Sequence, residues 1–271
     1  MMRKTLTYSI SDLRPYINWI YFDYAWGISA KAKEEQTKLR KEADEMLDKL
    51  EPLYKTHAVF GLYEANSDGD DLLLGDVRIP LLRQQKKQPA GKPNLCLSDF
   101  VRPIDQGIKD EAGAFATTVD MGLETDFDHD PYEKMLVQTL ADRLAEATAE
   151  KMHEDVRKNY WGYAPDEELT PDDLFKEKYR GIRPAVGYPS LPDFSINFIL
   201  SDLLGMKDIG IHLTESGAMK PHASVSGLMF AHPASQYFTL GKIGEDQLED
   251  YTRRRGLPEE VIRRFLGASL K

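Results

Sequence analysis

The spacing of apolar side chains along the chain predicts blocks of helix and strand. A highly charged segment from about Ala30 to Leu50 is expected to form a helix that ends before Pro52. Between Pro131 and Tyr160 the apolar residues recur at steps of four and three, which is typical of a helix with one apolar face. That apolar stripe consists of Leu136, Leu140, Leu144 and Ala147. Ser9 or Ser11 can cap a further short helix, with Leu13, Tyr16 and Ile17 on its inner side.

Several other segments have the pattern of strands. "THAVFGLYEA" and "LLLGDVRIPLL" are predicted to be two strands joined by a turn, "NSDGDD", with Gly69 at its tip. "NLCLSDFV", "GAFATTVD", "IGIHLTE", "ASVSGLMFAHP" and "QYFTLGKI" are further candidates, while "FSINFILSDLLG" predicts a helix stopped by Gly205 and two capped helices finish the chain. Because strands and helices come in blocks, we predict an α+β fold with a mostly antiparallel twisted sheet and flanking helices. No repeat or linker is visible, so residues 1–271 are expected to form a single domain.

Composition and charge narrow the class of protein. Of the 271 residues, 41% are hydrophobic and 30% charged, and the formal net charge is −10, which argues against nucleic-acid binding as a primary task. No apolar run approaches the roughly 20 residues that cross a bilayer, and the N-terminal segment lacks the apolar stretch of a signal peptide, so no membrane partner is expected. The only cysteine, Cys96, excludes an internal disulfide and any multi-cysteine metal site. These features favour a cytoplasmic protein.

Five arginines between Arg253 and Arg264 form a local exception to the acidic charge. Glu249 and Asp250 stand four residues before Arg253 and Arg254, which is the favourable order for ion pairs on a helix. We expect these arginines to be paired within the chain. A small cationic docking face for an acidic partner is the alternative.

Most conventional catalytic motifs are absent from the sequence. It contains neither the glycine-rich dinucleotide and phosphate motifs nor G-x-S-x-G or H-E-x-x-H. His212, His222 and His232 recur every ten residues, but no carboxylate or thiolate completes a ligand set, so no metal site is predicted. Asp142 and Glu146 lie one turn apart, off the apolar stripe, where carboxylates are usually solvated; Glu146 is nevertheless retained as a candidate ligand-binding residue.

The segment "YRGIRPAVGYP", from Tyr179 to Pro189, has the properties of a rigid binding loop. Its prolines favour extended backbone at the residues before them, and Gly181 and Gly187 permit backbone conformations that side chains hinder. Arg183 offers a planar fork suited to a carboxylate, and Tyr188 offers an aromatic face with a polar tip. A ligand with a carboxylate and a planar ring would match this pair. The alternative is that Arg183 ties down a neighbouring carboxylate and Tyr188 belongs to the core.

This loop resembles the R-P-A-x-G-Y-P motif of the activation domain of cobalamin-dependent methionine synthase, the part of that enzyme that binds S-adenosylmethionine. Further segments resemble the family in the same order, among them "LRPYINW", "LADRLAEATAE", "VRKNYWGYAP", "LTESGAM" and "ASVSGLMFAHPASQYF". Together they extend from about Leu13 to Phe265. The resemblance therefore covers nearly the whole chain.

The resemblance implies specific ligand contacts. Arg183 would bind the carboxylate of S-adenosylmethionine, and the backbone from Ala185 through Gly187 to Tyr188 would cradle the rest of it. The aromatic pair after "HP" falls on Tyr237, whose hydroxyl would lie near the methyl donor, and on Phe238, which stands where the family has a second tyrosine.

The N-terminal part of the expected site departs from the family. Asn18 precedes Trp19 where the family usually has aspartate, so a charge-assisted bond to the ligand's ammonium group would be lost. Weaker binding than is usual for the family is therefore expected. Asp23 lies five residues further on, which on a helix turns it away from the face of Asn18.

The function implied is reactivation of methionine synthase: the chain would present the methyl group of S-adenosylmethionine to the reduced cobalamin of a partner, with a flavodoxin-like electron donor. Methyltransferase activity would require that partner, since the D-x-H-x-x-G motif of cobalamin domains is absent from this chain. A non-enzymatic docking or chaperone subunit for a corrinoid protein, with weakened or lost S-adenosylmethionine binding, is one alternative. An unrelated methyltransferase or ligand sensor on the same scaffold is another. The start of the chain favours a free-standing subunit over an excised fragment.

Overall fold

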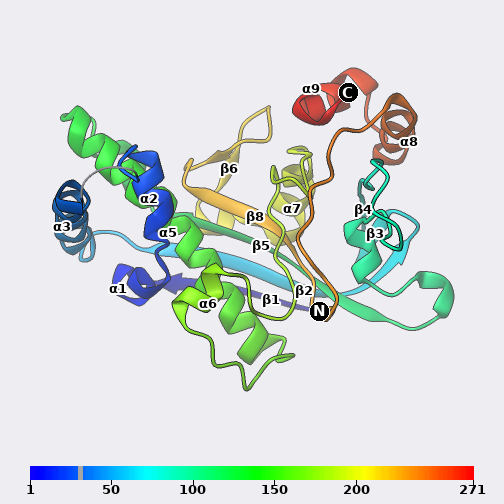
Figure 1. Ribbon diagram of the computed structural model, residues 1–271, viewed down its shortest axis with the longest axis horizontal. Coiled ribbons are helices and arrows are strands. Elements are labelled where there is room, and N and C mark those ends of the chain that lie inside the picture. The colour runs from blue at the N-terminus through cyan, green and yellow to red at the C-terminus, as the bar shows by residue number, and fades with distance from the viewer. Residues whose placement is uncertain (30–32) are drawn as a thin grey trace.

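The fold is built on one twisted antiparallel sheet with helices on both faces (Figure 1). The computed structural model describes residues 1–29 and 33–271. Its six-stranded sheet has the order β4-β3-β2-β5-β8, and β1 pairs with the first half of β2. The strands are β1 (Met2–Tyr8), β2 (Thr56–Asp68), β3 (Asp71–Leu74), β4 (Val77–Pro80), β5 (Asp110–Val119) and β8 (Ser224–Met229), and a separate hairpin joins β6 (His212–Leu213) to β7 (Met219–Lys220). The predicted α+β class and antiparallel sheet are confirmed.

Most predicted helices are confirmed. The helices are α1 (Ile10–Leu13), α2 (Trp19–Ala25), α3 (Lys33–Leu50), α4 (Gly122–Thr125), α5 (Pro131–Asp155), α6 (Pro171–Phe175), α7 (Ile196–Leu204), α8 (Glu245–Arg255) and α9 (Glu259–Leu266). Ser9 caps α1 as predicted, because its hydroxyl accepts from the backbone N–H of Asp12. The predicted start of α3 at about Ala30 lies outside the described residues.

Three strand predictions fail in the structure. "LLLGDVRIPLL" is two short strands, β3 and β4, because the chain turns at Gly75. "NLCLSDFV" contains a 3-10 helix, Leu97–Phe100, in which the carboxylate of Asp99 accepts from the backbone N–H of Cys96 at 2.8 Å. "QYFTLGKI" forms no strand at all. In addition, β1 was not predicted.

Alternation along β2 divides the core into two layers. Ala58, Phe60 and Leu62 pack on one face of the sheet with α5, whereas Val59 and Tyr63 pack on the other with residues of α7. Successive residues of a strand point to opposite faces, so a strand buried on both sides reads as a nearly continuous apolar run. Figure 1 shows α5 crossing the strands diagonally. This places the long helix α5 where it can carry a site.

Helix α5 is held at its start by a cap and changes geometry at its end. The carboxylate of Asp130 accepts from the backbone N–H groups of Tyr132 and Glu133 at 2.8 and 2.9 Å. After Asp155 the helix continues as one π-helical turn, Val156–Tyr160, and the N–H of Trp161 donates to the carbonyl of Val156, five residues earlier. Leu136, Leu140, Leu144 and Ala147 are all buried, so the predicted apolar stripe is confirmed.

Four of the five arginines near the C-terminus, all except Arg264, form ion pairs among the described residues, as expected. Arg254 donates to Asp250 at 2.7 Å and also to the buried Asp71 on β3. Arg253 likewise pairs with Asp250, and Arg263 with Glu259. The pair with Asp71 fastens α8 to the sheet, and a further ion pair, between Arg263 and Glu245, joins α9 to α8. No helix among the described residues has the length and apolar character needed to span a membrane.

Candidate functional site

The loop that follows Tyr179 pairs with the free edge of β8. Ile182 exchanges two backbone hydrogen bonds with Phe230, each 2.9 Å long, and the N–H of Val186 donates to the carbonyl of Ser226 at 2.8 Å. Neighbouring residues of an extended segment point in opposite directions. The backbone N–H of Arg183 therefore points away from β8, and its side chain lies on the opposite face of the sheet from that of Ile182, on the side of α5. Gly181 (φ 87°) and Gly187 (φ 89°) adopt the left-handed backbone conformations expected of them.

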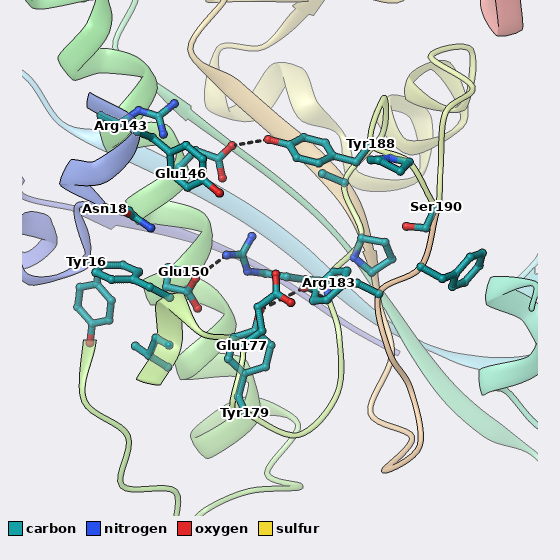
Figure 2. A pocket seen from close by; sticks show the side chains of 18 of the residues that line it. Tyr16, Asn18, Arg143, Glu146, Glu150, Glu177, Tyr179, Arg183, Tyr188 and Ser190 are labelled. Atoms are coloured by element: carbon teal, nitrogen blue, oxygen red, sulfur yellow. Dashed lines mark hydrogen bonds and ion pairs between the residues drawn. The ribbon is translucent and has the colours of Figure 1, made fainter. Parts of the chain in front are cut away.

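A cavity of about 500 Å³ lies between this loop and α5 (Figure 2). Its walls come from four separate parts of the sequence: the start of α2, the middle of α5, residues 174–190 and the segment that follows β8. The volume lies within the range of typical small-molecule sites. Of the residues predicted to bind ligand, the cavity is lined by Asn18, Glu146, Arg183, Ala185, Tyr188, Tyr237 and Phe238. Gly187 does not line it.

A buried ion pair crosses the cavity. One terminal nitrogen of Arg183 donates to Oε2 of Glu150 on α5 at 2.6 Å, and the two side chains are only 14% and 8% exposed. Burial, the largest single influence, would lower the pKa of Arg183, but Glu150 together with Tyr179, Tyr237 and Glu146 outweighs it and holds that pKa well above its usual value. Nε of Arg183 and Oε1 of Glu150 are both buried and have no hydrogen-bond partner within the described residues. A polar ligand could satisfy these atoms, because buried polar groups are normally paired.

Two tyrosine hydroxyls support the backbone of the loop. The N–H of Arg183 donates to the hydroxyl of Tyr237 at 3.0 Å, and that hydroxyl lies 3.1 Å from the hydroxyl of Tyr179. Burial raises the pKa of both tyrosines, so both remain neutral donors and acceptors. The hydroxyl of Tyr237 therefore has two partners within the chain.

Asn18 lines the cavity as the N-cap of α2. Its side-chain carbonyl oxygen accepts from the backbone N–H of Ile20 at 3.2 Å. The oxygen that could accept from a ligand's ammonium group is thus engaged by the helix, and among the described residues the amide NH₂ has no hydrogen-bond partner. Asp23 is absent from the lining residues, as expected from its helical position.

Two further carboxylates, those of Glu146 and Glu177, line the cavity. Glu146 accepts from the hydroxyl of Tyr188 at 3.1 Å, and the charge of Glu146 together with partial burial raises the pKa of Tyr188 to about 12. Glu177 has a left-handed backbone (φ 54°), which is uncommon for a residue with a side chain. Figure 2 places its carboxylate beside Arg183. Partial burial raises the pKa of Glu177, while Arg183 opposes that shift.

The charges around the cavity sum to a small negative value. Three carboxylates, those of Glu146, Glu150 and Glu177, face two guanidiniums, those of Arg143 and Arg183, which gives −3 + 2 = −1. The cavity therefore suits a ligand that is positive overall but carries a carboxylate. Among the described residues, no group of three or more histidine, cysteine, aspartate or glutamate side chains could hold a metal ion. His212, His222 and His232 therefore belong to no such group.

Sequence reasoning did not single out Glu150, Glu177 or Tyr179, which all line the cavity. For Glu150 a signal existed, since it follows Glu146 by one helical turn on the same face of α5. Glu177 carries no comparable signal, because its direction depends on a backbone conformation that the sequence does not indicate.

Comparison with known proteins identifies the family of the chain. Residues 9–256 match the family model described as the vitamin B12 dependent methionine synthase, activation domain. A solved structure described as the crystal structure of the MetH reactivation domain bound to AdoHcy is 41% identical in sequence, with a TM-score of 0.95. The similarity covers 100% of this chain and 90% of that one. The chain therefore belongs to the family of activation domains of vitamin B12 dependent methionine synthase.

Proposed function

We propose that this chain binds S-adenosylmethionine in the cavity beside α5 and presents its methyl group to the reduced cobalamin of a partner protein. The observation that carries the proposal is the buried Arg183, whose Nε has no hydrogen-bond partner among the described residues, in a cavity of net charge −1. S-adenosylmethionine carries a carboxylate, an ammonium and a sulfonium group, so its net charge is +1 and complements the cavity.

The lining residues supply a partner for each part of this ligand. Arg183 offers its remaining guanidinium donors to the ligand's carboxylate. Glu146 and Glu177 provide negative charge for the ammonium and sulfonium groups. The rings of Tyr188 and Phe238 provide faces for the adenine, and Ala185 lines the side of the cavity formed by the loop.

The chemistry proposed for the site is methyl transfer by positioning. A flavodoxin-like protein would supply one electron to the partner's oxidised cobalt, and the reduced cobalt would then take the methyl group from sulfur. The S–CH₃ bond breaks, a Co–CH₃ bond forms, and S-adenosylhomocysteine leaves. No general acid or base is required, because proximity and orientation provide the acceleration. We further propose that residues 1–271 act as one domain, since both core layers share one sheet.

Calorimetric titration with S-adenosylmethionine tests this function. Removing a charge-assisted contact of about 1.5–3 kcal/mol, as in Arg183→Ala, should weaken binding by roughly 10- to 150-fold. Arg183→Lys keeps a charge beside Glu150 but loses the fork, so it should also bind weakly while remaining folded. Arg263→Ala, in the ion pair with Glu259, is the control and should bind normally. Absence of binding by the unmodified protein at millimolar ligand would refute the proposal.

A docking subunit without the methyl donor is the second candidate. It is favoured by Asn18, whose carbonyl oxygen is taken up by the helix cap, and by the missing hydroxyl at Phe238. This candidate predicts that a cobalamin-protein partner is stabilised or reactivated equally well without S-adenosylmethionine. Reactivation that depends on the methyl donor would rule it out.

A further inference from the structure

A second buried ion pair lies directly behind the proposed binding site. Arg157 on the π-helical turn has a fully buried side chain, and its Nη2 donates to Oε1 of Glu167 at 2.5 Å. Its Nε lies 3.1 Å from both oxygens of the same carboxylate. Charges are expensive to bury, and a buried ion pair is weak evidence of a gain in stability. The placement of this pair therefore calls for a role beyond holding the fold together.

The pair contacts the site through Tyr179. The guanidinium of Arg157 lies over the ring of Tyr179, 4.4 Å from its centroid, and His153 packs edge-on against the same ring at 5.0 Å. His153 also accepts from Arg157 at 2.9 Å. The hydroxyl of Tyr179 lies within hydrogen-bonding distance of the hydroxyl of Tyr237. The Tyr237 hydroxyl in turn accepts from the backbone N–H of Arg183. An unbroken series of contacts thus runs from Glu167 to the backbone of Arg183.

The helix register explains why these contacts coincide. Glu146, Glu150, His153 and Arg157 are spaced by four, three and four residues, which places them on one face of a helix. Glu146 bonds Tyr188, Glu150 bonds Arg183, and the last two hold Tyr179. One face of this helix therefore contacts the loop at three positions: Tyr179, Arg183 and Tyr188. A π-turn at its end is a feature frequently found at functional sites.

We infer that Arg157 and Glu167 are positioning residues for the proposed binding site, acting through the hydroxyls of Tyr179 and Tyr237 on the backbone of Arg183. The effect of these two residues on ligand affinity rests on the proposed function. Their effect on the loop backbone does not depend on any ligand. His153 contributes a neutral ring, since burial and the adjacent guanidiniums lower its pKa.

Amide hydrogen exchange in the ligand-free protein tests the positioning directly. Tyr179→Phe removes one hydroxyl and keeps the ring on Arg157, and Glu167→Gln removes the charge of the carboxylate. Both should speed exchange at the N–H of Arg183, by about fivefold for the loss of one hydrogen bond. The amides of Ile182 and Val186, which bond β8, should keep their rates and serve as internal references.

A buried pair elsewhere in the chain provides the matched control. Asp71 is 3% exposed, pairs with Arg254 and Arg78, and does not line the cavity. Asp71→Asn should lower stability without changing exchange at Arg183. Equal acceleration by Asp71→Asn, or an unchanged Arg183 amide in Tyr179→Phe, would overturn the inference.

Binding then completes the test. Tyr179→Phe and Glu167→Gln should each weaken the binding of S-adenosylmethionine by about fivefold. The double variant should bind no worse than the weaker-binding single variant, because both changes act through the same hydroxyl. Fully additive losses would contradict the shared route. If the unmodified protein binds no S-adenosylmethionine, the proposed function fails, whereas the exchange measurements still decide the role of Arg157 and Glu167.

Discussion

Replacement of Asn18 by aspartate should strengthen ligand binding. The side chain caps α2 through one oxygen, 3.2 Å from the N–H of Ile20, and an aspartate can keep that bond because it is an equally good N-cap. The change converts the group left free from an amide NH₂ into a carboxylate oxygen. The charge of the cavity lining would shift from −1 to −2.

The expected gain follows from the ligand's ammonium group. A charge-assisted hydrogen bond is roughly twice as strong as a neutral one, and the difference of about 1 kcal/mol corresponds to about fivefold in Kd. The helix dipole should add about 0.3–1 kcal/mol to the unfolding free energy of Asn18→Asp. Calorimetric titration and urea unfolding measure the two effects separately.

A truncated ligand provides the control for this prediction. 5′-Methylthioadenosine lacks the amino-acid part, so its affinity should be the same for Asn18→Asp as for the unmodified chain. An equal gain for both ligands, or a gain in stability with no gain in S-adenosylmethionine affinity, would show that Asn18 does not face the ammonium group.

Two further changes test the electrostatics around the cavity. Glu177→Gln should weaken the binding of S-adenosylmethionine about threefold to fivefold more than that of S-adenosylhomocysteine, because only the former carries a sulfonium charge. Titration with both ligands measures this ratio, and equal losses of affinity would contradict the role of Glu177. His153 should make the fold acid-sensitive: its pKa is lowered on folding, so the unfolded chain binds the extra proton and stability is lost as pH falls below about 6.5. Urea unfolding at pH 7.5 and 5.5 should therefore show a smaller loss for His153→Gln than for the unmodified chain, and identical losses would refute it.

The fold was predictable where the apolar period is regular. The four-and-three spacing of α5 and the apolar run of β2 appear in the structure as expected. The prediction failed at "QYFTLGKI". Tyr237 and Phe238 pack on the core layer that contains α7, whereas Leu240 and Ile243 pack in a separate cluster with buried residues of α8 and α9. A loop that packs against two cores has the same alternation as a strand, although it makes no ladder of hydrogen bonds.

The site was only partly predictable, because its walls come from distant segments. The stiffness of the loop at Arg183 could be derived from its prolines and glycines, and the resemblance supplied Asn18 and Tyr237. The sequence offered a carboxylate partner for Arg183 as an alternative, but neither source indicated that this partner is Glu150 or that Asn18 turns its oxygen toward the helix. These details depend on tertiary contacts that no local pattern encodes.

Transfer of a labelled methyl group tests the central claim most directly. The chain would be mixed with a cobalamin-binding methionine synthase partner in its oxidised form, a flavodoxin-like reductant and S-adenosylmethionine labelled in the methyl group. We predict that label appears on the partner's cobalamin in amounts that depend on this chain and fall at least tenfold with Arg183→Ala, in line with the lost ligand contact. Label transfer that is unaffected by omitting the chain, or by Arg183→Ala, would contradict the account.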